Sequence, residues 1–361
     1  ETPFKAAIAV LPDRAGIDTL YVIVKATVTL RPTFSLAEIQ VPPTMADEYY
    51  ADPATSSLRF GSDMHVGKPG TDVLLIGSAW APGKRPVTRL QVSMSVAGSH
   101  KTILVTGDRV WRDGQPSDPK PFESMPLVWE RAFGGVHRRG EQVLAEERNP
   151  VGCGFAGGRS AGEMQGLPVP NLEDHAAPLE QLGQTPVPAC LAPIAASWLP
   201  RRAHAGTYDE RWQRTRAPYL PDDFDPRFLQ NAAPEFAFDR YLQAGEQVEV
   251  SGVTPDGPIA FKVPDARLLV AVTVADSLPE PSANLETLSV AELDARVAAL
   301  AGEIDRVKAE LQRKKAHEAA AAALFKGESG NPAHAAYPRR GYASRFIIQS
   351  RLTMATSSGS V

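Results

Sequence analysis

The sequence predicts a mainly β protein: a sandwich-like or barrel-like body of many short strands with long, ordered, proline-rich loops, followed by one long C-terminal α-helix. Runs of β-branched residues, such as LYVIVKATVTL at residues 20–30, are typical of strands. The 361 residues include 32 prolines and 28 glycines, which favour short strands and turns over long helices. One proline-free stretch near the C-terminus has helical periodicity instead.

Residues 1–110 form the predicted N-terminal β region. Alternation of apolar and polar residues, with Pro or Gly at the borders, places strands at residues 20–30, 72–80, 89–96 and 101–106. The last two strands flank Ala97-Gly98-Ser99-His100. Because Gly98 can adopt the positive φ that a tight turn needs, these two strands are predicted to form a hairpin.

Residues 111–240 form the predicted middle region, which is rich in loops and packs on the β body. Half of the prolines lie between residues 116 and 234, so long regular elements are not expected there. The region is also rich in aromatic residues, which disordered linkers lack, and it is therefore predicted to be ordered. Trp129 and Trp212 are predicted to be its buried anchors. The stretch 157–190 has the fewest aromatic residues, and we expect it to be the most mobile part.

A short helix is predicted within this middle region, at about residues 208–216. Thr207 and Glu210 have the spacing of a capping box, in which Thr207 is the N-cap and Glu210 reaches back to it. Pro218 then ends the helix.

Residues 241–276 are predicted to return to β structure. Apolar residues mark strands at about 248–253, 259–263 and 268–274. The tail, residues 327–361, is rich in Gly, Ser and Asn and is expected to be loose apart from a strand-like run at 344–352.

Residues 285–326 are predicted to form the long helix. Their apolar residues step by four and three positions, which is the spacing of a coiled-coil seam. This seam could bind a partner protein, join two copies of the chain, or pack on the chain's own β body, and the sequence leaves these alternatives open. The seam consists of Leu293, Val297, Leu300, Ile304, Val307 and Leu311.

Composition excludes several classes of function. The net charge is −4 and basic residues are scattered, whereas nucleic-acid binding needs a concentrated basic face. No run approaches the roughly 18 apolar residues of a membrane span, and residues 1–10 do not have the pattern of a signal peptide. Two cysteines 37 positions apart do not suggest a disulfide framework, so we expect a reducing cytoplasm.

Three runs imitate catalytic or nucleotide-binding signatures but lack the surroundings that these sites need. Residues 152–157 match G-x-G-x-x-G without a preceding strand, and residues 158–162 match G-x-S-x-G without well-placed acid and base partners. Residues 61–68 resemble a P-loop with one residue too many between the glycines. The seven histidines show no metal-ligand spacing. We therefore predict no catalytic, cofactor-binding or metal-binding residues.

Seven sequence features occur in a fixed order and together resemble a bacterial family known as a domain of unknown function. They are residues 68–73 (KPGTDV), 129–135 (WERAFGG), 149–152 (NPVG), Trp198, 205–212 (AGTYDERW), 220–225 (LPDDFD) and 232–234 (AAP). The resemblance covers about residues 3–275. It implies a cytoplasmic adaptor, or chaperone, of a type VI secretion system, which binds a toxic effector and loads it onto the secreted spike. The effector and the spike protein are then the expected partners.

We expect the residues of these signatures to hold the fold, while other surfaces choose the client. The residues concerned are Trp129, Glu130, Arg131, Phe133, Gly134, Gly135, Gly206, Thr207, Tyr208, Asp209 and Trp212. Two alternatives remain. An enzyme acting on a polysaccharide would need paired carboxylates, for which Glu130, Asp209 and Asp225 are available. A structural spike component would show internal repeats, and none is evident.

Overall fold

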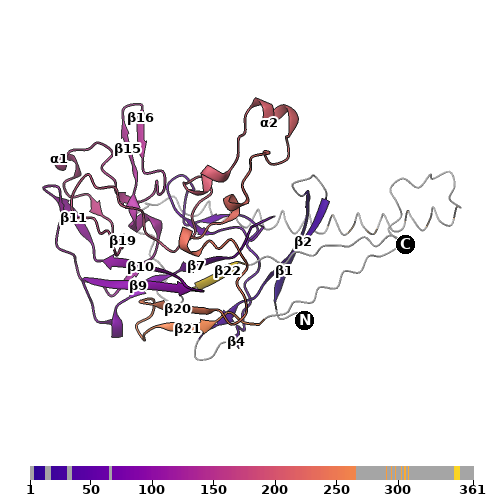
Figure 1. The fold of residues 1–361 in the computed structure, drawn as a ribbon, viewed down its shortest axis with the longest axis horizontal. Coiled ribbons are helices and arrows are strands. Elements are labelled where there is room, and N and C mark those ends of the chain that lie inside the picture. The colour runs from indigo at the N-terminus through magenta and orange to yellow at the C-terminus, as the bar shows by residue number, and fades with distance from the viewer. Residues whose placement is uncertain are drawn as a thin grey trace. The chain divides into compact units, whose positions relative to one another are not determined.

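The structure is a computed structural model that describes residues 4–12, 18–30, 35–64, 67–265 and 345–349, together with six single positions between 290 and 308. Strands dominate these residues, which confirms the prediction of a mainly β protein (Figure 1). Residues 1–266 and 342–361 form one compact unit, and residues 267–341 form another.

The strands are β1 (Lys5–Pro12), β2 (Asp18–Lys25), β3 (Val28–Thr29), β4 (Ser35–Leu36), β5 (Glu48–Tyr49), β6 (Leu58–Phe60), β7 (Asp72–Ile76), β8 (Ser78–Trp80), β9 (Arg89–Val96), β10 (Ser99–Thr106), β11 (Arg109–Arg112), β12 (Gln115–Pro116), β13 (Ser124–Pro126), β14 (Phe133–Gly134), β15 (Val136–Arg139), β16 (Gln142–Ala145), β17 (Cys153–Gly154), β18 (Pro168–Val169), β19 (Leu172–Asp174), β20 (Gln247–Ser251), β21 (Ile259–Lys262) and β22 (Arg345–Gln349). The α-helices are α1 (Ala161–Met164) and α2 (Glu210–Thr215). Short 3-10 helices are η1 (Pro82–Lys84), η2 (Trp129–Arg131), η3 (Arg201–His204), η4 (Pro226–Leu229) and η5 (Pro234–Phe236).

A five-stranded antiparallel sheet forms the centre of the body, in the order β19-β10-β9-β20-β21 (Figure 1). Its hairpin β9–β10 was expected from the sequence, but the turn is tighter than predicted. Ser99 already pairs with Val96, so only Ala97 and Gly98 connect the strands, both with positive φ (49° and 90°). Two consecutive residues with positive φ are the mark of a type I′ turn, whose twist matches that of the flanking strands.

The core lies on one face of this sheet. Alternate residues along β9, such as Val92, Met94 and Val96, are fully buried, as expected when one face of a strand is covered. The same core contains Val73, Leu74 and Leu75 of β7. All five side chains of this strand are buried. β7 pairs with β22 in antiparallel register, from Ile76 with Arg345 to Asp72 with Gln349. The strand predicted at residues 344–352 is thus confirmed.

The middle region supplies part of the core. Trp129 and Trp198 are each only 4% exposed, and their rings meet edge to face with centroids 6.0 Å apart. The stretch 157–190, which was expected to be the most mobile, lies wholly within the described residues. This stretch contains β19, an edge strand of the central sheet in which Leu172 is fully buried, and it ends at the fully buried Cys190.

Most of the predicted helix at 285–326 lies outside the described residues. Its six described positions, 290, 294, 297, 302, 305 and 308, are helical and exposed. Val297 is the one seam residue among them, and its side chain is 66% exposed. The predicted strand at 268–274 and the tail beyond residue 326, apart from β22, also lie outside the described residues.

Three features of the described residues bear on the expectations from composition. None of their helices has both the length and the apolar character needed to cross a bilayer. No three or more His, Cys, Asp or Glu side chains among them gather where they could hold a metal ion. Cys153 and Cys190 are free thiols, and burial raises the pKa of each to about 12.

Candidate protein-binding lobe

The signature at residues 129–135 ties distant parts of the body together. The indole N–H of Trp129 donates to the carbonyls of Ala192 (3.2 Å) and Pro193 (3.0 Å), which fixes a buried loop against the core. The carboxylate of Glu130 accepts hydrogen bonds from the backbone N–H (2.7 Å) and the hydroxyl (2.8 Å) of the fully buried Ser57. These contacts give the signature a structural role.

Arg131 and Phe133 extend this network to a second core. The Arg131 guanidinium donates to the side-chain carbonyl of Asn171 (2.8 Å), and the Arg131 carbonyl accepts from the Asn171 backbone N–H (2.8 Å). Phe133 is 2% exposed and belongs to a small apolar cluster with Trp111 and Met164. A single short segment therefore anchors two apolar clusters.

Gly134 and Gly135 allow the signature at residues 149–152 to lie directly against this segment. A Cβ on Gly134 would lie 2.1 Å from the carbonyl oxygen of Asn149, so no larger residue fits there. The Asn149 side chain is fully buried and donates to the carbonyls of Trp129 (2.8 Å) and Phe133 (3.0 Å). The two signatures form one structural unit.

A buried ion pair within the first signature is hydrogen-bonded to the residue that precedes the last signature. Lys68 Nζ lies 2.6 Å from Asp72 Oδ2, and the same oxygen accepts from the backbone N–H of Asn231 (2.7 Å), next to residues 232–234. Gly70 allows close backbone contact here, because a Cβ on it would meet the Phe238 carbonyl at 2.3 Å. Lys68 is the lysine of the P-loop-like run, and this contact buries it inside the protein, with Asp72 as its ion-pair partner.

The two remaining signatures, residues 205–212 and 220–225, build a lobe that projects away from the central sheet and carries α2 at its tip (Figure 1). We call residues 201–229 the lobe. The part of the lobe between its base and its tip, which we call the neck, is held together by Asp223. Its carboxylate accepts hydrogen bonds from the backbone N–H (2.9 Å) and the hydroxyl (2.7 Å) of Thr207. Gly206 has a φ of 80°, and a Cβ on it would lie about 3 Å from Asp223, Pro221 and Phe224.

The base of the neck is anchored in the body. Arg201, only 6% exposed, donates to the carbonyls of Ile194 (2.7 Å) and Phe228 (2.9 Å). His204 Nδ1 lies 3.1 Å from Asp225 Oδ2, and Asp225 also pairs with Arg227 and caps η4. The Arg227 guanidinium is the main cause that lowers the pKa of Asp225 to about 2. Hydrogen bonds and ion pairs therefore hold the neck of the lobe together at its base.

Aromatic side chains gather at the tip of the lobe and remain accessible to solvent. The rings of Tyr208 and Trp212 meet at 4.8 Å, and the Trp212 indole N–H donates to the Tyr219 carbonyl (2.8 Å). The Arg216 guanidinium lies 5.7 Å from the centroid of the Tyr219 ring. Tyr208 is 53% exposed, Tyr219 38% and Leu220 41%. Tyr, Trp and Arg side chains that solvent can reach are typical of protein-binding surfaces.

Two predictions about the lobe were wrong. The N-cap of α2 is Asp209, whose carboxylate accepts from the Trp212 backbone N–H (2.8 Å). Thr207 does not cap the helix because its hydroxyl is bound to Asp223. Trp212 is half-buried and packs within the lobe, so it is not a buried anchor like Trp129.

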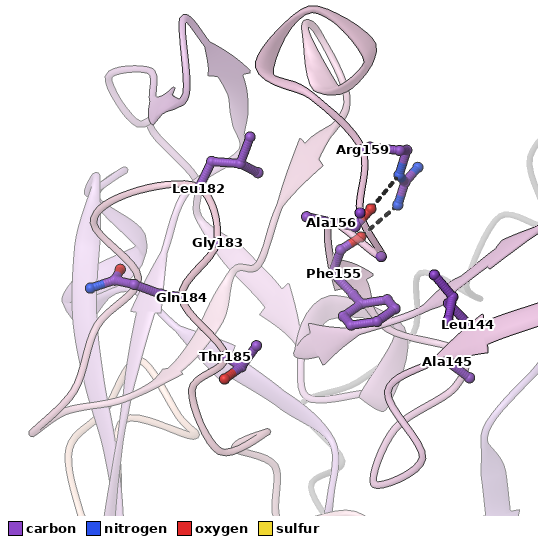
Figure 2. Close-up of a pocket in the computed structure, with 11 residues that line it drawn as sticks. Leu144, Ala145, Phe155, Ala156, Arg159, Leu182, Gly183, Gln184 and Thr185 are labelled. Carbon is purple, nitrogen blue, oxygen red and sulfur yellow. Dashed lines mark hydrogen bonds between the residues drawn. The ribbon is translucent and has the colours of Figure 1, made fainter.

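The runs that imitate G-x-G-x-x-G and G-x-S-x-G line an open groove of about 560 Å³ (Figure 2). Its other walls come from β16 and from residues 182–185. Ser160 is the N-cap of α1 and forms a capping box with Glu163, with 2.8 Å between Ser160 Oγ and Glu163 Oε2. Arg159 donates to the carbonyls of Ala156 (2.9 Å) and Phe155 (2.5 Å), as Figure 2 shows. The hydrogen bonds of Ser160 and Arg159 therefore stabilise the conformation of the loop that contains these two residues.

The three carboxylates considered for an enzyme are all engaged in structural hydrogen bonds. Glu130 binds Ser57 on the body, Asp209 caps α2 at the tip of the lobe, and Asp225 caps η4 at its base. They come from separate elements with separate local roles. This arrangement gives no support to a pair of carboxylates acting together on a glycosidic bond.

Comparison with known proteins places the chain among bacterial proteins. The model of a family described as "uncharacterized protein conserved in bacteria (DUF2169)" matches residues 15–301, which is most of the chain. The chain belongs to the DUF2169 family. No curated protein and no solved structure matches it. The matched residues include all seven signatures and both the neck and the tip of the lobe.

Proposed function

We propose that this DUF2169 protein is a cytoplasmic adaptor of a bacterial type VI secretion system, which binds a toxic effector and loads it onto the secreted spike. The observation that carries the proposal is the tip of the lobe, where Tyr208, Tyr219 and Leu220 are exposed beside the half-buried Trp212. Such a tip favours a protein-binding function over catalysis. The order of the signatures along the chain, which resembles that of secretion adaptors, supports the particular system.

The lobe has the two properties that a binding surface needs. Hydrogen bonds in its neck and base join Thr207 to Asp223, Arg201 to Phe228 and His204 to Asp225, so little conformational entropy should be lost when a partner binds. Its tip offers large aromatic rings that gain contact area without ordering many rotatable bonds. The seam of the 285–326 helix stays a second candidate surface, with Val297 exposed.

The experiment deletes the gene in its native bacterium and measures the proteins secreted by the type VI system. Complementation uses the wild type, the double variant Tyr208→Ala/Tyr219→Ala, and Ile39→Ala as a matched control at an exposed apolar residue outside the lobe. Deletion should remove one effector from the culture medium. The wild type and Ile39→Ala should restore it, and the lobe variant should fail to restore it or to co-purify with it.

The outcomes test two points separately: whether the protein acts in type VI secretion, and whether the lobe is the surface that binds the effector. Type VI secretion that is unchanged by deletion would overturn the adaptor function. If deletion removes the effector from the medium and the lobe variant restores it fully, the adaptor function stands and the effector binds at another surface. Melting temperatures of the purified variants serve as the folding control, since both tyrosines are substantially exposed and their removal should leave the body intact.

A further inference from the structure

The β1–β2 ribbon has an apolar strip on one face, which ends at the pair Pro12 and Asp18. In an antiparallel pair, directly opposite residues point to the same face. The register pairs Ala6 with Val24, Ile8 with Val22 and Val10 with Leu20, so these six residues share a face. Ile8 is 68% exposed, Val10 62% and Leu20 44%. Soluble proteins rarely leave such a continuous apolar strip uncovered.

β1 is the outer strand of this ribbon. Among the described residues, β1 pairs with no strand except β2. Residues 21–25 of β2 are half-buried, and Lys25 is tied to the body by an ion pair with Asp63 at 2.7 Å. In β1, by contrast, residues 5, 6, 8, 10 and 11 are exposed. β1 is therefore the more exposed of the two strands of the ribbon, and among the described residues no third strand pairs with it.

The edge of β1 carries two protective residues, Lys5 and Pro12, and both lie at the ends of the strand. The six residues between them, AAIAVL, contain no charge, proline or glycine, and the register with β2 is continuous, without a bulge. An edge strand that is exposed, regular and apolar is a template for pairing with another strand. The same features in a protein that stays monomeric would favour aggregation, so the edge requires a cover.

We propose that β1 receives an edge strand of a different, folded β protein, which adds to the ribbon as a third strand while the rest of that protein packs on the apolar face. A ribbon eight residues long and two strands wide measures roughly 27 Å by 10 Å, or about 270 Å². That is far below the roughly 800 Å² per partner of a stable interface, so two copies packed face to face would be weak. Two copies joined edge to edge would double the exposed apolar face. Addition of a strand from a different protein adds backbone hydrogen bonds, and the rest of that protein adds contact area to the interface.

The first test places a photo-crosslinking residue, p-benzoylphenylalanine, at position 8 or position 10 of the full-length chain in its native bacterium. Mass spectrometry then maps the crosslinked peptides. The expected result is that both positions link to one segment of one other protein, at sites about two residues apart, as a strand requires. Crosslinks to a second copy of the chain, to the chain itself, or to no reproducible segment would overturn the proposal.

The second test uses a synthetic peptide of the mapped segment and measures its binding to the full-length chain by fluorescence anisotropy. Val10→Lys should weaken binding about tenfold or more, because it places a charge on the apolar face. Ile39→Lys, at a residue that is 80% exposed and lies outside the ribbon, is the matched control and should bind normally. Equal affinities of both variants would also overturn the proposal. Neither variant touches the lobe, so the result is independent of the proposed client site.

Discussion

The ammonium group of Lys68 and the carboxylate of Asp72 form an ion pair of 2.6 Å in which both side chains are buried. Burial lowers the pKa of Lys68, although the Asp72 carboxylate acts in the opposite direction. The pair lies where the first signature meets the segment that precedes η5 in the chain, through the hydrogen bond from Asn231 to Asp72. A charge buried in this way is stable only while its partner is present.

Replacing Lys68 by Met should therefore destabilise the fold strongly. The change leaves the Asp72 carboxylate buried without its countercharge, and we expect a loss of about 3–5 kcal/mol in the free energy of unfolding, measured by urea denaturation. The matched control is Arg202→Met, which removes an ion pair of 3.0 Å to Glu147 in which both side chains are about half exposed. Its loss should be about 1 kcal/mol or less. Similar losses in the two variants would contradict the structural role of the buried pair.

Gly134→Ala should disrupt the contact between the second and third signatures. The new Cβ would lie 2.1 Å from the Asn149 carbonyl, and relieving that clash requires the backbone to move. We expect a loss of roughly 3 kcal/mol in stability. Gly140→Ala is the control, because Gly140 also has a positive φ but a Cβ added to it would meet no atom within 4 Å. Backbone strain alone should lower its stability by about 1–2 kcal/mol.

The two tryptophans of the signatures should behave differently on replacement. Trp129→Ala removes a buried ring with two hydrogen bonds and should lower stability by about 3–5 kcal/mol. Trp212→Ala should lower it less, because the ring is half-buried and packs only within the lobe. Thermal unfolding followed by circular dichroism measures both. A larger effect at Trp212 than at Trp129 would show that the lobe supports the body more than its contacts indicate.

The neck of the lobe should loosen in acid. Hydrogen bonds from the backbone and hydroxyl of Thr207 lower the pKa of Asp223, so its carboxylate stays charged below the usual value for Asp. A depressed pKa means that the stabilising contribution is present above about pH 4 and is lost as pH falls through the folded-state pKa. Amide hydrogen exchange at Thr207 reports this directly. Protection relative to Asp223→Asn should be constant from pH 7 to about 4 and should vanish below it.

The sequence predicted those elements that depend on local pattern. The β-branched runs at residues 20–30 and 72–80 became β2, β3, β7 and β8, and the β9–β10 hairpin formed around Gly98. The burial of Trp129 also followed from its position in an ordered, proline-rich segment. In these cases neighbouring residues along the chain carry enough information to decide the structure.

The parts that were missed depend on contacts between distant residues. Thr207 and Asp209 are both good N-cap residues, and only the hydrogen bond between Thr207 and Asp223 decides between them. β19 has three residues and becomes a strand by pairing with β10, so no local pattern marks it. The exposed tip of the lobe was hidden for the same reason: its aromatic residues look like core residues in sequence, and only the projection of the neck places them in solvent.

The pairing of β7 with β22 sets the order in which this protein can be completed during synthesis. β7 is made before its ladder partner at residues 345–349, which leaves the ribosome only after all the residues between 76 and 345. Until then a strand with five inward-facing residues has an open edge, which invites pairing with other nascent chains. Contacts this far apart in sequence also form slowly. The nascent chain of this proposed adaptor would thus itself need protection from such pairing until β22 has been synthesised.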